Sequence, residues 1–327
     1  MQEQMWDRGL GLTALAVALV SGVSVWLAWQ TSGDLASRLS IGALAPIMGA
    51  AIMSYSLRVV RFHFFLLRSG VPISFRSTIV VQTIGFALSV TPGHVGEVFK
   101  LHLIRQRVGT PVAQTAPLFV LDRLTEGGGF LILAIGSAFA LPALRDQTPV
   151  PSLMLLALAV AFAFALTRRR WSGSIAAVNA RLANSKLGGR FVPHLQNLWN
   201  GLESSFTPSI ILGGLCLSAI ARFADGLVIF FAAHIVGVVL DVPTAVFILA
   251  VGGLAGGISL LPAGIGAVEL TTTGLLVLHG ATGANALTIA LLARLFSLWL
   301  WVALGLGAAF LLRLPAFRAW FGVSAEP

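Results

Sequence analysis

Ten charged side chains lie inside long apolar runs of this 327-residue sequence. They are Arg58, Arg61, Arg123, Arg222 and Arg294, and Glu97, Asp122, Glu126, Asp225 and Glu269. On insertion scales a charged group at the centre of a bilayer costs roughly 2.5 to 3.5 kcal/mol, so ten isolated charges would cost about 25 to 35 kcal/mol. These side chains must therefore pair with one another or line water. Equal numbers of the two signs make internal neutralisation feasible.

The spacing of several charges predicts direct contacts. Arg222 and Asp225, at i and i+3, can meet on one helix face. Asp122 and Glu126, at i and i+4, flank Arg123 and repel each other unless another arginine lies between them. Such groups could have a purely structural role and hold helices together. Alternatively, they could line a path for a charged substrate. We favour the path, because apolar packing could replace a purely structural buried ion pair at little cost.

One pattern of residues occurs twice, about 171 positions apart. Each copy has a Ser-x-x-Pro-x-x-x-Gly break, then a carboxylate, then an arginine inside the next apolar run. The matching positions are Ser89, Pro92, Gly96, Glu97 and Arg123, and Ser259, Pro262, Gly266, Glu269 and Arg294. A half-helix that starts after either glycine would aim its free N–H groups inward, where an anionic headgroup could bind. We expect Glu97–Arg123 and Glu269–Arg294 to be equivalent contacts.

Composition identifies the class of protein that holds these charges. The chain is 57% hydrophobic and 10% charged, with a mean hydropathy of +0.91, whereas a soluble globular chain carries about 25% charged residues. Several apolar runs reach the ~20 residues that a helix needs to cross a bilayer. The runs lie near residues 10–30, 41–67, 73–91, 112–144, 150–167, 208–240, 244–279 and 285–312. We therefore predict an all-α polytopic membrane protein and exclude an ordinary soluble enzyme.

The distribution of basic residues predicts the topology. Connections rich in lysine and arginine stay on the cytoplasmic side of a membrane. The segment 168–207 is rich in them. Basic residues also flank the 73–91 run, with Arg68 and Arg76 before it and Lys100, Arg105 and Arg107 after it, so the hairpin 73–107 should enter from the cytoplasm and return. The 244–279 run, between Asp241 and an uncharged connection, would enter and leave on the outer face. We predict about six full spans plus two re-entrant helical hairpins, with both termini cytoplasmic; a plain eight-span count is the alternative.

Opposite entry of two similar segments predicts inverted-topology repeats within a single transmembrane domain, residues 1–327. Repeat 1 covers approximately 41–144 and repeat 2 approximately 208–312, with the second hairpin at 244–279. Between them, the cytoplasmic loop 168–207 is predicted to contain an amphipathic helix on the inner membrane surface; a linker helix packed on other protein is the alternative. In transporters built this way, broken helices meet near the bilayer midplane and form the substrate site.

The two breaks resemble those of the lysylphosphatidylglycerol synthase transmembrane-region superfamily, which includes the flippase domain of MprF and the YbhN-like membrane proteins. The motifs are Pro92-Gly93-His94-Val95-Gly96-Glu97, Leu121-Asp122-Arg123 and Pro262-Ala263-Gly264-Ile265-Gly266-Ala267-Val268-Glu269. The resemblance covers roughly residues 40–310 and implies two hairpins that meet in the membrane and transport of lipids or lipid-linked molecules. His94 stands where the family commonly has arginine, so headgroup preference does not carry over. We do not expect the soluble aminoacyl-transfer domain of bifunctional members in this chain.

The two hairpins are therefore expected to share a substrate-binding site. Its candidate residues are Arg58, Arg61, His94, Glu97, Arg123, Glu126, Arg222, Asp225, Glu269 and Arg294, and the hairpin breaks are Pro92, Gly93, Gly96, Pro262, Gly264 and Gly266. His94 could bind phosphate or titrate, or make an ordinary polar contact. The sequence has no metal-ligand spacing and no Walker-type motif, so we expect no metal, no cofactor and no ATP-driven step.

The favoured function is a lipid flippase or transporter rather than an enzyme. The headgroup of a phospholipid, an aminoacylated lipid or a lipid-linked molecule would cross the bacterial cytoplasmic (inner) membrane through the charged cavity between the hairpins. An intramembrane lipid-modifying transferase, with paired carboxylates for acid–base work, and an ion-coupled carrier of a small solute stay open as alternatives. Membrane lipids are the expected partners, and a homo-oligomer or a separate lipid-modifying enzyme is compatible with the sequence. Nucleic acid is not expected, because the basic residues follow the positive-inside pattern.

Overall fold

The computed structural model describes residues 39–90, 98–141, 207–259 and 261–312, together with Gly22 and Leu314. Within these ranges the chain is mostly helical and has no β-strand, which confirms the all-α class. Three helices, Ile41–Arg68, Pro208–Val236 and Gly283–Leu311, are long and apolar enough to cross a membrane. The apolar runs near 10–30 and 150–167 and the predicted amphipathic helix in 168–207 lie outside the described residues.

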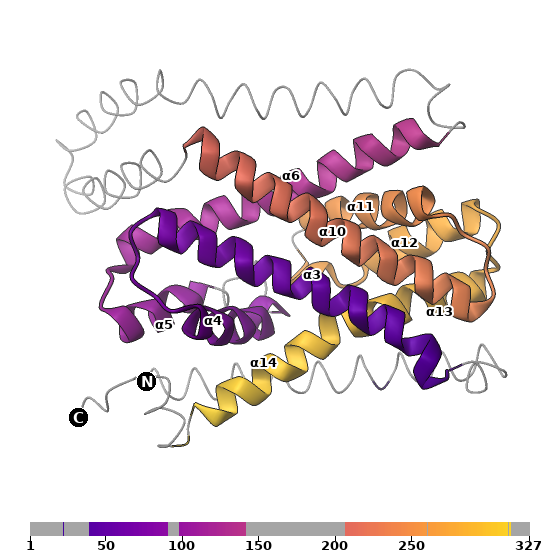
Figure 1. Ribbon diagram of the computed structural model, residues 1–327. Coiled ribbons are helices and arrows are strands. Elements are labelled where there is room, and N and C mark those ends of the chain that lie inside the picture. The colour runs from indigo at the N-terminus through magenta and orange to yellow at the C-terminus, as the bar shows by residue number, and fades with distance from the viewer. Residues whose placement is uncertain are drawn as a thin grey trace, which may run out of the picture.

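The helices follow one another in an order that is the same in both halves of the chain (Figure 1). A long helix comes first, then two short helices, then another long helix. In the first half these are α3 (Ile41–Arg68), α4 (Phe75–Ala87) with the 3₁₀ turn η1 (Leu88–Val90), α5 (Phe99–Val108) and α6 (Val112–Ala140). In the second half they are α10 (Pro208–Val236), α11 (Val242–Ile258), the 3₁₀ turn η3 (Pro262–Gly264), α12 (Ala267–Leu278), and α13 (Gly283–Arg294) continued by η4 (Leu295–Trp299) and α14 (Leu300–Leu311).

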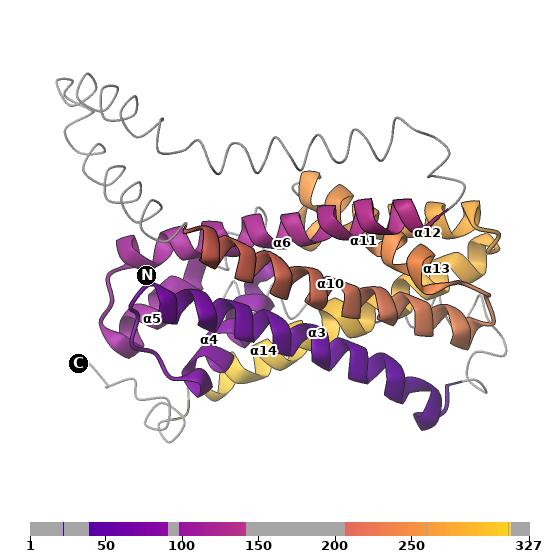
Figure 2. The same cartoon turned by 45° about the horizontal axis from the view of Figure 1, so that its top comes forward.

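The long helices α3 and α10 form the centre of the bundle and run antiparallel. Arg58 meets Asp225 and Arg61 meets Ser218, so that positions later in α3 pair with positions earlier in α10. Figures 1 and 2 show the two helices alongside each other. At about 1.5 Å per residue, the 28 residues of α3 are longer than the ~30 Å hydrocarbon core. Each of these helices is therefore long enough to carry side chains from one membrane face to the other.

The four short helices are each shorter than the ~20 residues of a full span. Helices α4 and α5 have 13 and 10 residues, and α11 and α12 have 17 and 12. Short links join α4 to the end of α3 and α5 to the start of α6, so both outer ends of this pair lie at one end of the bundle. Equally short links hold α11 to α10 and α12 to α13 at the opposite end, and Figure 1 shows the two pairs at opposite ends of the molecule.

Each short pair packs against the last long helix of the other half. Helix α4 packs on α14, where a Cβ added at Gly305 would lie 2.2 Å from the carbonyl oxygen of Thr83. Helix α11 packs on α6, where a Cβ added at Gly253 would lie 2.4 Å from the Phe130 ring. Both crossings therefore need a residue without a side chain. Because the packing is exchanged between the halves, η1 at the end of α4 and the second break at η3 are brought into contact with each other.

Candidate functional site

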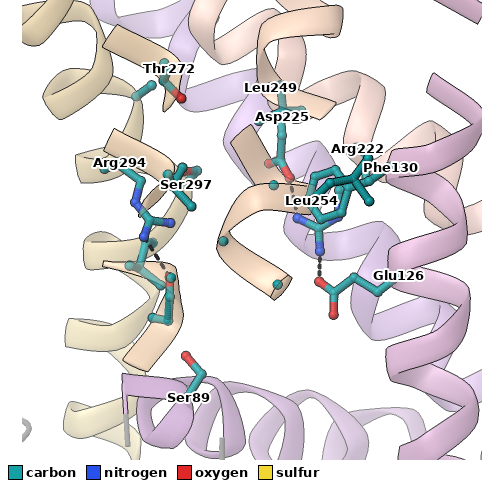
Figure 3. Close-up of a pocket in the computed structure, with 18 of the residues that line it drawn as sticks. Ser89, Glu126, Phe130, Arg222, Asp225, Leu249, Leu254, Thr272, Arg294 and Ser297 are labelled. Carbon is teal, nitrogen blue, oxygen red and sulfur yellow. Dashed lines mark hydrogen bonds and ion pairs between the residues drawn. The ribbon is translucent and has the colours of Figure 1, made fainter. Parts of the chain in front are cut away.

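A cavity of about 480 Å³ is lined by residues from both halves of the bundle and is within the size range of small-ligand sites (Figure 3). Helices α3, α6 and α10 line one side of it, and the C-terminal half of α11 also contributes to the lining. The η3 break, α12, α13 and η4 line the other side, and Ser89 of η1 also faces it. The charged lining residues among those described are Arg58, Arg123, Glu126, Arg222, Asp225, Glu269 and Arg294. All seven were predicted from the sequence to bind substrate.

The first side of the cavity is a chain of ion pairs with alternating sign, which we call the arginine wall: Arg58, Asp225, Arg222, Glu126 and Arg123. Asp225 Oδ2 accepts hydrogen bonds from Arg58 Nη2 at 2.5 Å and from Arg222 Nη1 at 2.8 Å. Glu126 in turn pairs with Arg222 and, at 2.9 Å, with Arg123 Nη1. Asp225 is thus shared by Arg58 of α3 and Arg222 of α10, and Glu126 is shared by Arg222 of α10 and Arg123 of α6. This confirms the predicted Arg222–Asp225 contact.

The second side, which we call the break wall, consists of Arg294, Glu269 and the backbone of the second break. Arg294 Nε donates to Glu269 Oε1 at 2.7 Å, the contact predicted from the repeat, and Arg294 Nη2 donates to the Ala263 carbonyl at 2.7 Å. The other oxygen of Glu269 accepts the N–H of Gly266 at 2.6 Å and so caps the start of α12. One arginine therefore ties the break to the helix that follows it.

The backbone of this break departs from helical geometry. Ala263 has a φ of +49°, which is unusual for a residue with a side chain, and Gly264 and Gly266 have φ values of +66° and +87°. A Cβ on Gly264 would lie 2.9 Å from the Cα of Gly256, so the chain needs glycine at both points of closest approach. The backbone from Ala263 to Gly266 is therefore non-helical, in the segment where the second break was predicted. The Arg294 guanidinium satisfies one of the carbonyl groups that the break releases.

The predicted counterpart of this contact in the first repeat involves residues outside those described. These residues lie in the segment 91–97 and are Glu97, His94 and the break residues Pro92, Gly93 and Gly96. Arg123, the proposed partner of Glu97, lies 2.9 Å from Glu126 and 3.8 Å from Asp122. The predicted repulsion between these two acids is therefore relieved by Arg123 itself, together with Arg61 on Asp122 and Arg222 on Glu126.

A second polar cluster lies behind the arginine wall and is centred on Asp122. Arg61 donates to Asp122 Oδ1 from Nη2 at 2.7 Å and from Nε at 3.0 Å, and its Nη1 donates to Ser218 at 2.9 Å. Lys100 Nζ approaches Asp122 Oδ2 at 3.8 Å and Gln82 at 3.4 Å. Arg61, predicted to bind substrate, is therefore buried beside the cavity rather than in its lining. This cluster joins α3, α4, α5, α6 and α10.

Lys100 is a second charged residue whose position differs from the one predicted from the sequence. Because it follows an apolar run, it was counted with the cytoplasmic basic residues that flank the 73–91 run. In the structure it is 1% exposed, and its ammonium lies 4.9 Å from the centre of the Phe62 ring. A Cβ at Gly85 would lie 2.1 Å from Lys100 Cγ, so Gly85 of α4 leaves the space that the lysine stem fills. Within the residues that the structure describes, Lys100 is thus a buried cation in addition to the five arginines counted from the sequence.

Polar side chains without charge complete the site. Ser89, Thr272 and Ser297 line the cavity, and Figure 3 shows Ser89 below the space between the two walls. Sequence reasoning used Ser89 only as a marker of the repeat. In the part of the chain that the structure describes, no three His, Cys, Asp or Glu side chains are grouped as metal ligands. The arrangement is suited to hold an anion by charge-assisted hydrogen bonds, which are the strong ones in a low-dielectric site.

Comparison with known proteins agrees with the resemblance seen in the motifs. The family described as "Lysylphosphatidylglycerol synthase TM region" matches residues 13–305. A curated "UPF0104 membrane protein" of Methanothermobacter thermautotrophicus is 25% identical over 314 residues, which cover 89% of this chain and 90% of that protein. The match extends over both walls and both halves of the bundle.

Proposed function

This chain belongs to the lysylphosphatidylglycerol synthase transmembrane-region family, and from that premise we propose that it moves the polar headgroup of a membrane lipid across the bilayer. The headgroup enters the cavity between the arginine wall and the break wall while the acyl chains stay in the bilayer. The observation that carries this proposal is the cavity itself, lined by seven charged side chains in the middle of an apolar helical bundle.

The short helices support a path that is built from re-entrant hairpins. Helices α4, α5 and α12 are too short to cross ~30 Å of hydrocarbon, and each pair returns to the end of the bundle from which it started. Backbone that is not helical is tolerated at membrane depth only where it is buried in protein or lines a wet cavity. The break at η3 lines the cavity. The proposed topology is therefore two hairpins that enter from opposite membrane faces.

The exchanged packing supports inverted repeats as the basis of this architecture. The order of helix lengths is the same in both halves, and each short pair packs on the last helix of the other half. A pseudo-twofold axis in the membrane plane produces this exchange, and transporters with such repeats place the substrate at the repeat interface. Alternating access then requires only that one hairpin moves relative to the other.

The orientation that we propose has the α3–α4 and α5–α6 links on the cytoplasmic side. Arg68 ends α3, Arg76 lies in the first turn of α4, and Arg105 and Arg107 end α5, all at that end of the bundle. Basic residues next to spans are retained in the cytoplasm. We propose the cytoplasmic membrane as the location, with both termini inside. Reporter fusions at the α3–α4 and α10–α11 links would give opposite signals.

The proposal assigns no catalytic step, because the described carboxylates of the cavity are each held by arginine. The Arg294–Glu269 pair serves as the latch of the second break: when it opens, Ala263 and the start of α12 are free to shift. The arginine wall compensates the negative charge of the passing headgroup. Each charge-assisted hydrogen bond contributes about 1.5 to 3 kcal/mol, which corresponds to about a tenfold effect or more per contact.

The test is a lipid-scrambling assay in vesicles that contain the purified protein and a fluorescent phospholipid, with external bleaching as readout. We expect the wild type to expose the inner-leaflet label, and Arg294→Ala and Glu269→Gln to slow this at least tenfold. Arg105→Ala, which removes an exposed arginine at the end of α5, is the matched control and should be unchanged. Equal rates for wild type and both latch variants would contradict the roles assigned to them.

A further inference from the structure

Arg222 lies in the middle of the arginine wall and is held from three directions. Its guanidinium pairs with Asp225 on its own helix and with Glu126 of α6. The ring of Phe130, also on α6, stacks against the guanidinium, with 4.5 Å between the ring centre and Arg222 Cζ, and Figure 3 shows the two side chains together. Glu126 and Phe130 are four residues apart, so one face of α6 presents both a carboxylate and an aromatic ring to the same arginine.

The ring contact supplements the hydrogen bonding of a buried cation. Arg222 is 5% exposed, and its Nε atom has no hydrogen-bond acceptor among the described residues. Its two carboxylates meet it at the Nη atoms. A cation within about 6 Å of the centre of an aromatic face is attracted by the ring quadrupole, and the attraction increases when the pair is removed from water. The Phe130 ring therefore stabilises the Arg222 guanidinium in the wall.

The edge of the same ring contacts the second short pair, α11 and α12. A Cβ added at Gly253 of α11 would lie 2.4 Å from Phe130 Cε1 and 2.5 Å from Phe130 Cζ. Helices α11 and α12 pack equally closely on each other, because a Cβ added at Gly256 would lie 2.4 Å from Val268 Cγ2. The two helices thus form one packed unit, and Phe130 lies between this unit and Arg222.

We propose that Phe130 is a positioning residue that couples the second short pair to the arginine wall. The place of α11 sets the place of the ring, and the ring sets whether the Arg222 guanidinium stays on its carboxylates or turns into the cavity. When α11 lies against the ring, Arg222 is held in the wall. When the second pair withdraws, the ring is free to shift and Arg222 becomes available to the headgroup. This deepens the proposed function and, as a control of transport, rests on it.

The first experiment measures how often Arg222 leaves the wall and needs no lipid transport. Purified protein in detergent is treated with phenylglyoxal, which modifies accessible guanidinium groups, and the modified peptides are quantified by mass spectrometry. Phe130 is replaced by monofluoro-, difluoro- and trifluorophenylalanine, which weaken the ring quadrupole and keep the shape of the ring. We expect the modification rate of Arg222 to rise with each added fluorine, by about three- to tenfold for the trifluoro ring, because a cation–π contact is weakened.

Two controls separate positioning from packing. The same analogues at Phe247 of α11, which packs against Ala138 of α6, should leave the modification rate of Arg222 unchanged. Arg61, 1% exposed in the cluster behind the wall, reports a general loosening of the bundle and should react at its wild-type rate in every variant. An unchanged Arg222 rate in the trifluoro protein would overturn the proposal, as would an increase at Arg61 as large as the increase at Arg222.

The link to the second pair is tested by Gly253→Ala, whose new Cβ must displace the ring. We expect this change to raise the modification rate of Arg222 about threefold, and to have no further effect when it is added to Phe130→Leu, where the ring is absent. The competing route is the direct packing of α11 on α10, where a Cβ added at Gly226 would lie 2.7 Å from Val246 Cγ2. A Gly253→Ala effect that persists at full size without the ring would overturn the coupling through Phe130.

The scrambling assay keeps this inference separate from the proposed function. Phe130→Leu should slow scrambling about threefold, because Arg222 no longer follows the second pair. If the wild type scrambles no lipid, the transport function is wrong, and the coupling measured by arginine modification stands. If the wild type and Phe130→Leu scramble lipid equally fast, transport stands and the control assigned to Phe130 is wrong.

Discussion

The two short-helix pairs are held in the bundle by different kinds of contact. The first pair is fixed by Lys100 and Gln82, which join the Asp122 cluster together with groups from three other helices, all buried. The second pair is held by Arg294 and Glu269, whose side chains are 14% and 16% exposed to the cavity. Breaking a buried ion pair on one side leaves an uncompensated charge, whereas a partly hydrated pair can open at lower cost. We infer that, in the proposed transport, the first pair stays fixed and the second pair moves.

The largest effect on stability is expected at Asp122. The Asp122→Ala change leaves Arg61 and Lys100 without their shared carboxylate and should lower the free energy of unfolding by about 3 to 5 kcal/mol. Denaturation of the purified protein in detergent measures it. Asp241→Asn is the control, because asparagine also accepts the hydrogen bond from the Thr244 N–H that caps α11. If Asp122→Ala and Asp241→Asn had the same free energy of unfolding, the Asp122 cluster would not hold the first pair in place as described.

A smaller loss of stability is expected where α14 crosses the first pair. In Gly305→Ala the new Cβ would meet the Thr83 backbone oxygen at 2.2 Å, and backbone must shift to make room. We expect a loss of about 1 to 3 kcal/mol. Gly136→Ala in α6, where nothing lies within 4 Å, should be neutral or slightly stabilising. If the two alanine variants unfold at the same denaturant concentration, the α4–α14 crossing is not as tight as described.

At the latch, stability and transport should respond differently. Replacing both Arg294 and Glu269 with glutamine removes the pair without leaving a lone charge, so the free energy of unfolding should change by only about 1 kcal/mol. Transport should fall at least tenfold, because the substituted pair cannot position the break. The two quantities are measured on one preparation by denaturation and by scrambling. A variant that is strongly destabilised would instead make this pair structural, like the Asp122 cluster.

The smallest effect is expected at Ser89, which belongs to the fixed pair but faces the cavity. Ser89→Ala removes a buried hydroxyl that makes no protein hydrogen bond within the described ranges, so stability should stay within about 0.5 kcal/mol. The scrambling rate should fall about threefold through loss of one hydrogen bond from an uncharged donor to the headgroup. Ser218→Ala, which removes a hydroxyl bonded to Arg61 away from the cavity lining, is the comparison: it should lower stability more than it lowers transport.

The sequence predicted two kinds of contact: those between residues spaced along one helix, and those between matching positions of the two repeats. Arg222–Asp225 follows from i,i+3 spacing, and Glu269–Arg294 follows from the order of the two breaks. The described helices other than α5 also occupy the predicted apolar runs to within a few residues, whereas α5 lies in the basic stretch that follows the 73–91 run. Contacts that require two helices to cross, such as Arg58–Asp225, carry no signal in the sequence. Their partners are fixed by the angle and register of α3 on α10.

Lys100 shows the physical reason why the sequence can misplace a buried charge. In the sequence, a buried lysine next to an apolar run looks the same as a lysine retained on the cytoplasmic side of the membrane. Only the tertiary packing distinguishes these two positions. The space for its stem is created by Gly85 on a different helix, and its counter-charge lies on a third. The net interior charge therefore cannot be obtained by counting charges within apolar runs. It can be obtained only from the folded bundle, which shows which charges next to the apolar runs are buried.

If η1 and the second break move apart to let a headgroup pass, a reversible cross-link between them should stop transport. This measurement tests the proposed movement most directly. Val90 of η1 lies in the hydrophobic cluster against which Ile265 of the second break packs. In a Cys216→Ala background, Val90→Cys and Ile265→Cys joined by a reducible cross-linker should stop lipid scrambling, and reduction should restore it. Scrambling that continues at the wild-type rate in fully cross-linked protein would contradict the account.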